Sequence, residues 1–470
     1  MITKKLRKII AVSLAAISMA GALAGCGGKN VAEGDVTVVR FWTNDGGGST
    51  VWQDMINEYN NTIGKEENIR IDYKLYSDSY TEVLETAFES KQVAELVALV
   101  GDTKVRIAKG QVKPLNELPG WENVNEEWAD YLKEDKNVFD GKVYTLPYNV
   151  TTFGLIYNTD MFEAAGIVDE NGKAKPPATW AEFAEVAKKL TDASKNQYGV
   201  MLPMKWGGYW YYEGTGPALS SSPTNGTNRA IFESDHSYLY PFMEALCKIK
   251  ADGSCFPGPE GMDNDPARAQ FATGNIGMKF GASWDVGVLT DQFPAECNWD
   301  IAPFPVANAD ERYMQIGQYG TIAGVSNYIE EDKLEAVGKV LKWMYSDEVA
   351  VRLYEEEISI PIRPGIAEKA NVENVSPAWQ SAQKLVSITT PFRGEYESLP
   401  SDLKVKTTLN SNDVLKQCWV DGDLEKMKKD LKKCAEEYKV AIREAFEELG
   451  EDINKYKLEP GYRKTVTWDY

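Results

Sequence analysis

The sequence predicts an α/β fold with two domains, and three observations support this prediction. Segments typical of strands and of helices alternate along the chain after its N-terminal region. This alternation is typical of a sheet covered by helices, and we expect most of its strands to be parallel. A chain of 470 residues is long enough for two such domains. Beyond the N-terminal region, the sequence has no apolar run long enough to cross a membrane.

The first domain opens with a strand, a loop and a helix. A β-branched and aromatic run at 36–42 ends in the glycine-rich segment 44–48. Apolar residues then recur at helical spacing, namely Val51, Trp52, Met55, Ile56 and Tyr59. Three further patterns predict a strand, a helix and a buried strand, at 69–75, 80–88 and 95–100 respectively.

The second domain is predicted to begin after 144–149, where an extended stretch leads into an apolar run at 153–158. Thr179 and Glu182 have the spacing of a capping box, which predicts the start of a helix. A short strand is expected at 198–202, and the last hundred residues are predicted to be largely helical.

The first 25 residues have the layout of a secretory signal peptide. A basic stretch precedes an apolar run from Ile9 to Ala24, which is too short to span a bilayer comfortably. The run ends in Leu23-Ala24-Gly25-Cys26, which resembles the lipobox of bacterial lipoproteins. That resemblance implies cleavage before Cys26 and a lipid on Cys26 that anchors the protein to the outer face of the cell membrane. Residues 26–34 are expected to form a flexible tether.

The net charge of the chain excludes some classes of partner. The formal charge is −20, and removal of the signal peptide with its four basic side chains would make it −24. Nucleic acids and anionic membrane surfaces need clustered Lys and Arg, so neither is expected as a partner. The membrane is therefore expected to be reached through the lipid anchor alone, and the high charge favours a soluble monomer.

Few residues are available for catalysis or for a metal site. His236 is the one histidine, in a polar stretch typical of a surface loop, so multi-histidine metal sites are excluded and no cofactor is expected. The glycines at 46–48 lack the Lys-Ser/Thr ending of a phosphate loop. After Cys26 there are five cysteines and no CxxC pair, which indicates neither a disulfide framework nor a thiolate metal site. One pair among Cys247, Cys255 and Cys297 could still be oxidised outside the cell.

Aromatic residues are the more informative signal. The chain has 13 Trp and 24 Tyr, and several lie in segments without helical spacing. The segment 204–212 contains Trp206, Tyr209 and Trp210, and Trp284-Asp285 follows a strand-like run at 276–280. Flat rings pack against the C–H faces of sugars, while acidic and amide groups bind the hydroxyls. The rings at 206–212 suit a ligand platform and core packing about equally, whereas the periodicity around Trp42 favours the core.

Several motifs occur in an order that is known from one family. They are Leu23-Ala24-Gly25-Cys26, Phe41-Trp42-Thr43-Asn44-Asp45-Gly46, Leu146-Pro147-Tyr148, Phe153-Gly154-Leu155-Ile156-Tyr157-Asn158-Thr159-Asp160, Pro177-Ala178-Thr179-Trp180-Ala181-Glu182-Phe183, Phe271-Ala272-Thr273-Gly274-Asn275-Ile276-Gly277-Met278 and Ser283-Trp284. Together they resemble the extracellular solute-binding proteins of carbohydrate ABC transporters, the group that includes maltose-binding protein. The likeness covers nearly the whole chain after Cys26.

The resemblance implies a two-lobed periplasmic-binding-protein-like fold, with a sheet and helices in each lobe. Lobe 1 would comprise 35–146 and 304–362, and lobe 2 would comprise 147–303 and 363–470. The chain would cross between the lobes near 144–149, near 302–306 and near 361–364. A ligand would bind in the cleft between the lobes, and the lobes would close around it by a hinge motion.

The resemblance also implies site residues. Asn44 and Asp45 fall in the loop after the first strand, and Asp102 matches a further acidic contact of that lobe. Trp284 matches a stacking tryptophan of the second lobe, and the segment with Trp206, Tyr209 and Trp210 lies where the family carries other contacts. Chemistry and position add four candidates, namely Tyr148, Asn149, Asp285 and Arg393.

The expected function is a non-enzymatic binding protein that delivers a sugar or oligosaccharide to ABC transporter permease subunits. Two departures weaken the match to maltose binding. Thr151 replaces an acidic contact that the family carries shortly after the crossover, and the family's late stacking tryptophan has no clear match before Lys404. One alternative is an extracellular glycoside hydrolase that uses two carboxylates, for which the sequence supplies no spacing evidence. Another alternative keeps the fold but binds a peptide or a polyamine.

Overall fold

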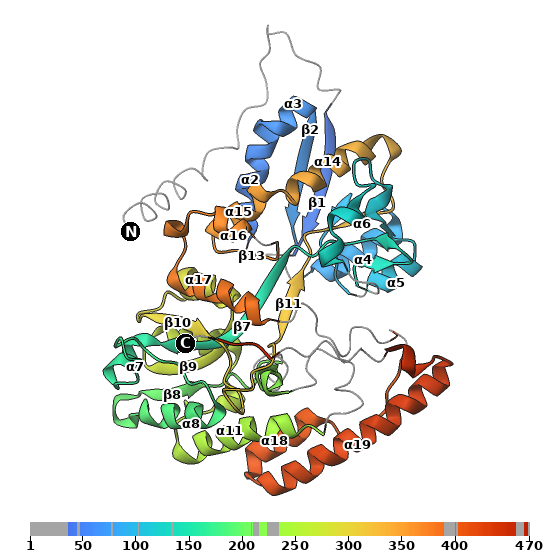
Figure 1. Cartoon of the computed structure of the whole chain (residues 1–470). Coiled ribbons are helices and arrows are strands. Elements are labelled where there is room, and N and C mark those ends of the chain that lie inside the picture. Colours follow the sequence, from blue (N-terminus) through green and yellow to red (C-terminus); the bar gives the residue numbers. More distant parts are fainter. Residues whose placement is uncertain are drawn as a thin grey trace. The chain divides into compact units, whose positions relative to one another are not determined.

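Figure 1 shows the computed structural model of the chain, in which residues 38–470 form one compact unit. Cys26 and the predicted signal peptide and tether lie outside the described residues. No helix in the described part is long and apolar enough to cross a membrane. The structure describes residues 36–44, 48–76, 79–101, 103–132, 136–207, 209, 216–222, 235–363, 365–389, 400, 403–456 and 465–468.

The first lobe is built on a five-stranded sheet in the order β2-β1-β3-β12-β4. Strand β3 runs parallel to β1, whereas β12 returns from far along the chain and pairs antiparallel with both β3 and β4. These strands are β1 (Thr37–Thr43), β2 (Ile69–Leu75), β3 (Leu96–Val97), β4 (Val112–Lys113) and β12 (Gly324–Ser326). A separate hairpin joins β5 (Val138–Phe139) to β6 (Lys142–Val143).

Helices that the periodicity predicts cover this sheet. Helix α2 buries Trp52, Met55, Ile56 and Tyr59, which are four of the five residues of its predicted stripe. Helix α4 covers the predicted range 80–88 and buries Tyr80, Leu84, Ala87 and Phe88. Both helix predictions are therefore confirmed. The helices of this lobe are α2 (Ser49–Asn61), α3 (Ile63–Glu67), α4 (Tyr80–Ser90), α5 (Thr103–Ala108), α6 (Val124–Glu127), α14 (Leu334–Met344), α15 (Asp347–Glu355) and α16 (Ile366–Lys369).

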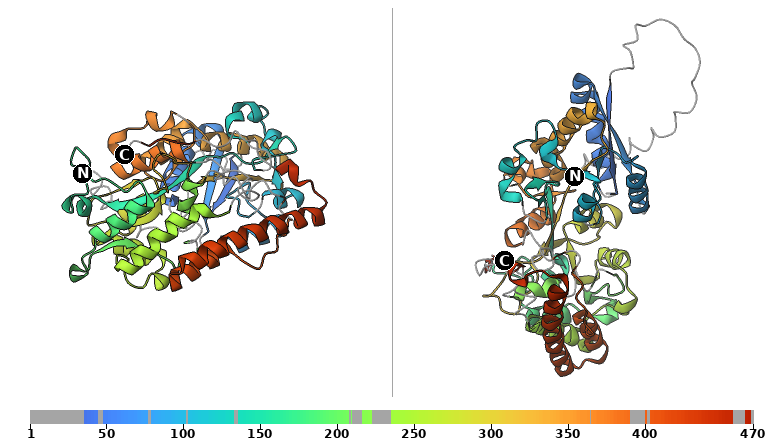
Figure 2. Two further views of the ribbon diagram at one scale, coloured as in Figure 1. Left: turned by 60° about the horizontal axis from the view of Figure 1, so that its bottom comes forward. Right: turned by 90° about the vertical axis from the view of Figure 1, so that its right-hand side faces the viewer.

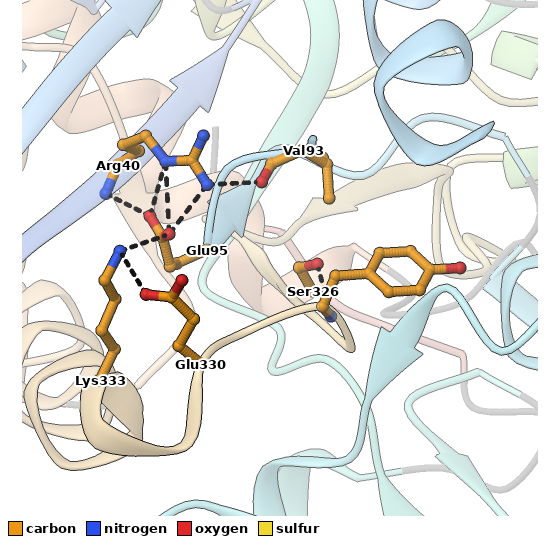
Figure 3. Close-up of polar contacts among 7 residues, drawn as sticks. Arg40, Val93, Glu95, Ser326, Glu330 and Lys333 are labelled. Atoms are coloured by element: carbon orange, nitrogen blue, oxygen red, sulfur yellow. Dashed lines mark hydrogen bonds and ion pairs between the residues drawn. The ribbon is translucent and has the colours of Figure 1, made fainter. Parts of the chain in front are cut away.

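An ion pair ties β1 to the start of β3 (Figure 3). The Arg40 guanidinium donates to both carboxylate oxygens of Glu95, at 2.9 and 3.0 Å, and its backbone N–H donates to Glu95 at 2.8 Å. Lys333 approaches the same carboxylate to 3.5 Å. Burial alone would raise the pKa of Glu95, but the hydrogen bonds and charge of Arg40 outweigh it and hold the pKa below its ordinary value. The pair therefore fixes the register of two neighbouring strands.

The second lobe is built on a sheet in the order β10-β7-β9-β8. Every residue of β9 is buried, because helices and loops cover both of its faces. The strands are β7 (Asn149–Asn158), β8 (Tyr198–Met201), β9 (Ile276–Ala282) and β10 (Trp299–Ala302). The helices are α7 (Thr159–Ala164), α8 (Trp180–Lys189), α9 (Gly216–Ala218), α11 (Tyr240–Asp252), α12 (Asn264–Ala272), α13 (Trp284–Gly287), α17 (Pro377–Lys384), α18 (Ser411–Asp421) and α19 (Leu424–Leu449).

Two local predictions are confirmed in this lobe. Helix α8 begins with the predicted capping box, in which the Thr179 hydroxyl accepts from the Glu182 N–H and the Glu182 carboxylate accepts from the Thr179 N–H. The C-terminal part is largely helical, and α18 and α19 pack against each other and against α11 (Figure 2). The buried stripe of α19 includes Met427, Leu431 and Cys434.

The expectation of mostly parallel strands holds for β1 with β3 but not for most of the described strand pairs. Among the described strand pairs, β1 with β3 and β8 with β9 are parallel, whereas β7 is antiparallel to both β9 and β10. Strand β12 is also antiparallel to its neighbours. The reason lies in the path of the chain. Two parallel strands need a connection, usually a helix, that returns the chain to the starting end of the sheet. Strands β7 and β12 instead enter their sheets directly from the other lobe.

Three segments that pass between the lobes lie side by side as a ribbon, which we call the crossover ribbon and define as β11 (Gly317–Gly320), the start of β7 and β13 (Ile360–Pro361) (Figure 1). Strands β11 and β13 both pair antiparallel with the first residues of β7. Phe304 and Ile316 still pack in the core of the second lobe. The second passage therefore lies at β11, later than the predicted 302–306, and we propose that lobe 2 extends to about residue 316.

The Tyr345 hydroxyl joins two of the three passages. It donates to the Leu146 carbonyl at 3.1 Å and accepts from the Ile322 N–H at 3.3 Å, while the Tyr345 carbonyl accepts from Arg363 at 3.0 Å. Tyr345 thus contacts chain segments next to all three strands of the crossover ribbon. The rings of Trp121, Trp128 and Tyr148 surround its own ring edge-on, at centroid distances of 5.6 to 6.3 Å.

We expect Tyr345→Phe to lower the free energy of unfolding by about 1–3 kcal/mol, because two buried backbone groups lose their partner while the ring packing stays. Urea unfolding measures the change. The matched control is Tyr59→Phe, since the Tyr59 hydroxyl is also buried but has no hydrogen-bond partner among the described residues. Equal free energies of unfolding for the two variants would show that the hydrogen bonds of the Tyr345 hydroxyl do not stabilise the fold.

Candidate functional site

In the first lobe, the candidate residue Asn44 lies at the end of the sheet where β1 and β3 end. These strands are parallel, so their carboxyl ends lie at the same edge of the sheet. Asn44 follows β1 directly and is exposed. The Tyr80 hydroxyl lies 3.2 Å from the Trp42 carbonyl and 2.6 Å from the Ala98 carbonyl, so it bridges the two strand ends. This edge therefore has a fixed backbone from which polar side chains can project.

The chain just before residue 102 is held by a buried arginine. The Arg106 side chain donates twice to the Val100 carbonyl, at 2.8 and 3.0 Å, and once to the Glu85 carboxylate at 2.7 Å. Arg106 thereby fixes the turn that leads into position 102. Asp45 and Asp102 themselves lie outside the described residues.

Two half-buried rings lie at the same edge. The Trp42 and Tyr76 rings meet edge-on with centroids 5.2 Å apart, and the Tyr76 N–H donates to the Thr43 carbonyl at 2.8 Å. Trp42 packs against the core cluster around Tyr80, but part of its surface remains accessible. Tyr76 is not among the site residues predicted from the sequence. Its position just past the end of β2, level with Asn44 after β1, was a signal that could have identified it.

In the second lobe, Trp284 stands at the end of the buried strand β9. Its side chain is 37% exposed, which is unusual for a residue so close to a fully buried strand. The ring meets that of Phe153 edge-on, with centroids 5.3 Å apart and an interplanar angle of 87°. The preceding residue is fixed as well, because the Ser283 N–H donates to the Thr152 carbonyl at 2.8 Å. The indole is therefore presented to solvent from a rigid support.

Asp285 lies directly behind this tryptophan and is only 1% exposed. Its carboxylate accepts from the Ala282 N–H at 2.9 Å and from Arg268 Nε at 2.6 Å, and the fully buried Lys279 lies 3.9 Å away. A Cβ at Gly281 would come within 2.7 Å of the same carboxylate, so only glycine fits there. Asp285 was selected as a ligand contact, but its oxygens face the interior. We therefore assign it to the support of Trp284.

The aromatic segment after β8 divides into two kinds of residue. Strand β8 runs parallel to β9, so this segment leaves the same sheet edge as Trp284. Trp206 is half-buried and packs against the core, whereas Tyr209 is fully buried within it. Burial removes Tyr209 as a direct ligand contact, because no solvent-facing surface of its ring remains. Trp210 lies outside the described residues.

The candidates near the crossover ribbon differ in exposure. The Tyr148 ring is buried against Tyr345, with centroids 5.9 Å apart. Asn149 is partly exposed, and its side chain lies over Gly320, where a Cβ would come within 2.2 Å of Asn149 Oδ1. Gly320 therefore leaves the space that the amide of Asn149 occupies. Arg393 lies outside the described residues.

The described residues contain no group of three or more His, Cys, Asp or Glu side chains that could hold a metal ion. His236 stands just before α11 with a backbone φ of 60°, and burial lowers its pKa. Its ring lies 6.2 Å from that of Tyr238, and it belongs to neither of the two sheet edges described above.

A family model described as bacterial extracellular solute-binding protein matches residues 44–351. The chain belongs to this family. Among the relatives of this solute-binding protein, the sn-glycerol-3-phosphate-binding periplasmic protein UgpB of Brucella melitensis is 25% identical over 329 residues, which are 65% of this chain and 72% of the relative.

Solved structures share the fold of this solute-binding protein. Apo RafE of Streptococcus pneumoniae is 16% identical, with a TM-score of 0.61, and the match covers 86% of this chain and 98% of RafE. The maltose/maltodextrin-binding domain MalE of Bdellovibrio bacteriovorus, bound to maltotriose, is 17% identical with a TM-score of 0.59, over 87% of this chain and 100% of MalE. The expected two-lobed periplasmic-binding-protein-like fold is therefore confirmed.

Proposed function

We propose that this chain captures a sugar or oligosaccharide between its two lobes and delivers it to an ABC importer without chemical change. The observation that carries the proposal is Trp284, an exposed indole on a rigid support at the end of β9. Such a ring can cover the apolar face of a pyranose. The fold shared with RafE, which has been solved in complex with raffinose, supports the same ligand class.

The proposed ligand contacts come from both lobes. Asn44, Asp45 and Asp102 would bind hydroxyls from the first lobe, where Tyr80 and Arg106 hold the backbone. Trp206, Trp210 and Trp284 would pack against the ring faces from the second lobe. Asn149, Tyr148 and Arg393 remain candidates near the crossover ribbon. Tyr209 and Asp285 are kept only as supporting residues because both are buried.

A second ligand class has one specific observation in its favour. The relative from Brucella melitensis is named for binding sn-glycerol-3-phosphate. A phosphate needs Arg, Lys or a row of backbone N–H groups. Among the described residues, the first-lobe edge offers the Trp42 and Tyr76 rings and the Asn44 amide, and the second-lobe edge offers the Trp206 and Trp284 rings. These groups favour a neutral sugar over a phosphorylated polyol.

Isothermal titration calorimetry with the purified chain tests the proposal. The panel should contain raffinose, maltotriose, xylo-oligosaccharides, chito-oligosaccharides and sn-glycerol-3-phosphate. We expect saturable binding of at least one oligosaccharide and no release of reducing ends during incubation. Released reducing ends would support the hydrolase alternative, and binding of sn-glycerol-3-phosphate alone would move the ligand class to phosphorylated polyols. No heat with any sugar would contradict the proposal.

We also propose that a lipid on Cys26 holds the protein at the outer face of the cell membrane and that the protein acts as a monomer. Two or more acyl chains on one residue retain a protein durably, because each buried CH₂ contributes about 0.8 kcal/mol. We expect Cys26→Ala to move the protein from the membrane fraction to the soluble fraction of cells. Continued recovery of the variant with the membrane would contradict the anchor. Gel filtration of the soluble form tests the monomer.

A further inference from the structure

Two cysteines far apart in sequence lie close together in the second lobe. Cys247 on α11 and Cys418 on α18 have their Sγ atoms 3.9 Å apart. Cys247 is half-buried and Cys418 is buried, so the pair can be reached from solvent on the Cys247 side. The structure thus brings Cys247 next to Cys418, which lies outside the predicted set of Cys247, Cys255 and Cys297.

Other contacts hold the two helices in this register. Lys250, one helical turn after Cys247, donates to the Trp419 and Val420 carbonyls at the end of α18 and lies 5.0 Å from the centre of the Trp419 ring. The Trp419 indole N–H donates to Glu260 at 2.7 Å. These contacts flank the two thiols and hold the helices that carry them next to each other. A disulfide needs the sulfur atoms about 2.0 Å apart, which rotation of the two side chains with a small helix shift can supply.

The contact between the two thiols shifts their acidities in opposite directions. The hydrogen bond with Cys418 lowers the pKa of Cys247 despite burial, whereas the hydrogen bond with Cys247 and burial raise the pKa of Cys418. Burial also raises the pKa of Cys255 to about 12 and that of Cys297 to about 11. The thiolate is the form that reacts with disulfides, so Cys247 is the most reactive of these four residues.

We propose that Cys247 and Cys418 form a disulfide once the protein is outside the cell. The oxidant is a disulfide of low molecular weight or of a thiol oxidoreductase. The Cys247 thiolate attacks one sulfur of that disulfide, forms a mixed disulfide and releases one thiolate. Cys418 then loses its proton and attacks the Cys247 sulfur, which releases the second thiolate. The two protein thiols lose two electrons and two protons, and the oxidant gains them.

The bond would close a covalent loop that passes twice through the crossover ribbon. Strands β9, β10, β11 and β13 and the first-lobe helices α14 and α15 all lie between Cys247 and Cys418 in the sequence. The bond would attach α18 and α19 to the rest of the second lobe. The inference needs an extracellular location, which the family indicates, and does not depend on which ligand is bound.

Mass spectrometry of the wild-type protein tests the proposal directly. The purified chain is incubated with oxidised glutathione, denatured, alkylated with iodoacetamide and digested without reductant. We expect a cross-linked peptide that contains Cys247 and Cys418, while Cys255, Cys297 and Cys434 carry the alkyl group. Full alkylation of both Cys247 and Cys418, or a cross-link of either to another cysteine, would overturn the proposal.

Thermal unfolding supplies a second readout. Reductant is expected to lower the Tm of the oxidised wild-type protein by at least ~3 °C, because the cross-link restricts the unfolded chain. The same treatment should leave the Tm of Cys418→Ser unchanged. The matched control is Cys434→Ser, which removes another buried cysteine of the same lobe and should keep the full reductant effect. If reductant also lowers the Tm of Cys418→Ser, the decrease comes from other groups and contradicts the proposed disulfide.

Discussion

Replacing Trp284 with alanine is expected to weaken binding of the proposed sugar ligand at least tenfold, which is about 1.4 kcal/mol. The indole is exposed and its backbone is held by Thr152, so the substitution removes the proposed stacking surface without opening a large core cavity. Trp284→Phe should lose less affinity, because a smaller ring remains in the same place. Calorimetry with the best ligand of the panel measures both variants.

A tryptophan of the first lobe provides the control for Trp284. Trp343 packs against Tyr59 and Trp52 between α14 and α2, and it lies on neither of the two candidate sheet edges. Trp343→Ala should lower the free energy of unfolding and leave the dissociation constant within about twofold, or 0.4 kcal/mol. If Trp284→Ala binds the ligand with unchanged affinity, Trp284 is not part of the site, whatever happens to Trp343→Ala.

The largest expected loss of stability follows from Asp285→Ala. Removing this carboxylate leaves the charge of Lys279 buried in the middle of β9 and deprives Arg268 of its shortest contact. Breaking a buried ion pair from one side costs about 3–5 kcal/mol, so we expect a decrease of that size in the free energy of unfolding. Urea unfolding measures it. The double variant Asp285→Ala/Lys279→Met should recover part of the loss, because the uncompensated buried charge is removed.

Asp265→Ala is the matched control, since Asp265 contacts the same Arg268 at 2.8 Å but is 56% exposed. An exposed pair contributes about 1 kcal/mol or less, so the free energy of unfolding of this variant should stay close to that of the wild type.

The variant Asp285→Asn separates the role of Asp285 in positioning Trp284 from its role in stability. It keeps the shape and one acceptor, and we expect weaker ligand binding in a protein that still unfolds cooperatively. Equal stability of Asp285→Ala and Asp265→Ala would refute the buried network.

The sequence supports reliable predictions where the signal is local. The stripe of α2, the stripe of α4 and the capping box of α8 each depend on residues within about two helical turns of one another, and all three are found. Trp284 could be selected because an aromatic residue directly after a buried strand is a local pattern. The same reasoning selected Asp285, whose partner Arg268 is 17 residues earlier on a separate helix. Sequence spacing could not reveal that this carboxylate faces inward.

Features that depend on the path of the whole chain were not predictable in this way. The lobe from which β7 and β12 arrive sets the direction of each strand. Because the pattern of apolar residues is the same for either direction, it could not reveal which one occurs. The proline-containing stretch at 302–306 suits an extended passage, yet Gly317–Gly320 is the segment that pairs with β7. Tyr345 has no sequence signal for its role, because its partners Leu146 and Arg363 lie in segments remote from it.

Thr152 connects the crossover ribbon to the backbone that carries Trp284. On one side this buried residue is paired with Gly317 of the crossover ribbon, and on the other it exchanges hydrogen bonds with Ser283, next to Trp284. Its hydroxyl donates to the Ala382 carbonyl on α17 at 2.9 Å, so the residue is braced in a third direction. We therefore expect bending of the ribbon to move Trp284, because only Thr152 separates the two. A substitution in the ribbon is then expected to change the affinity for the proposed ligand without contacting it.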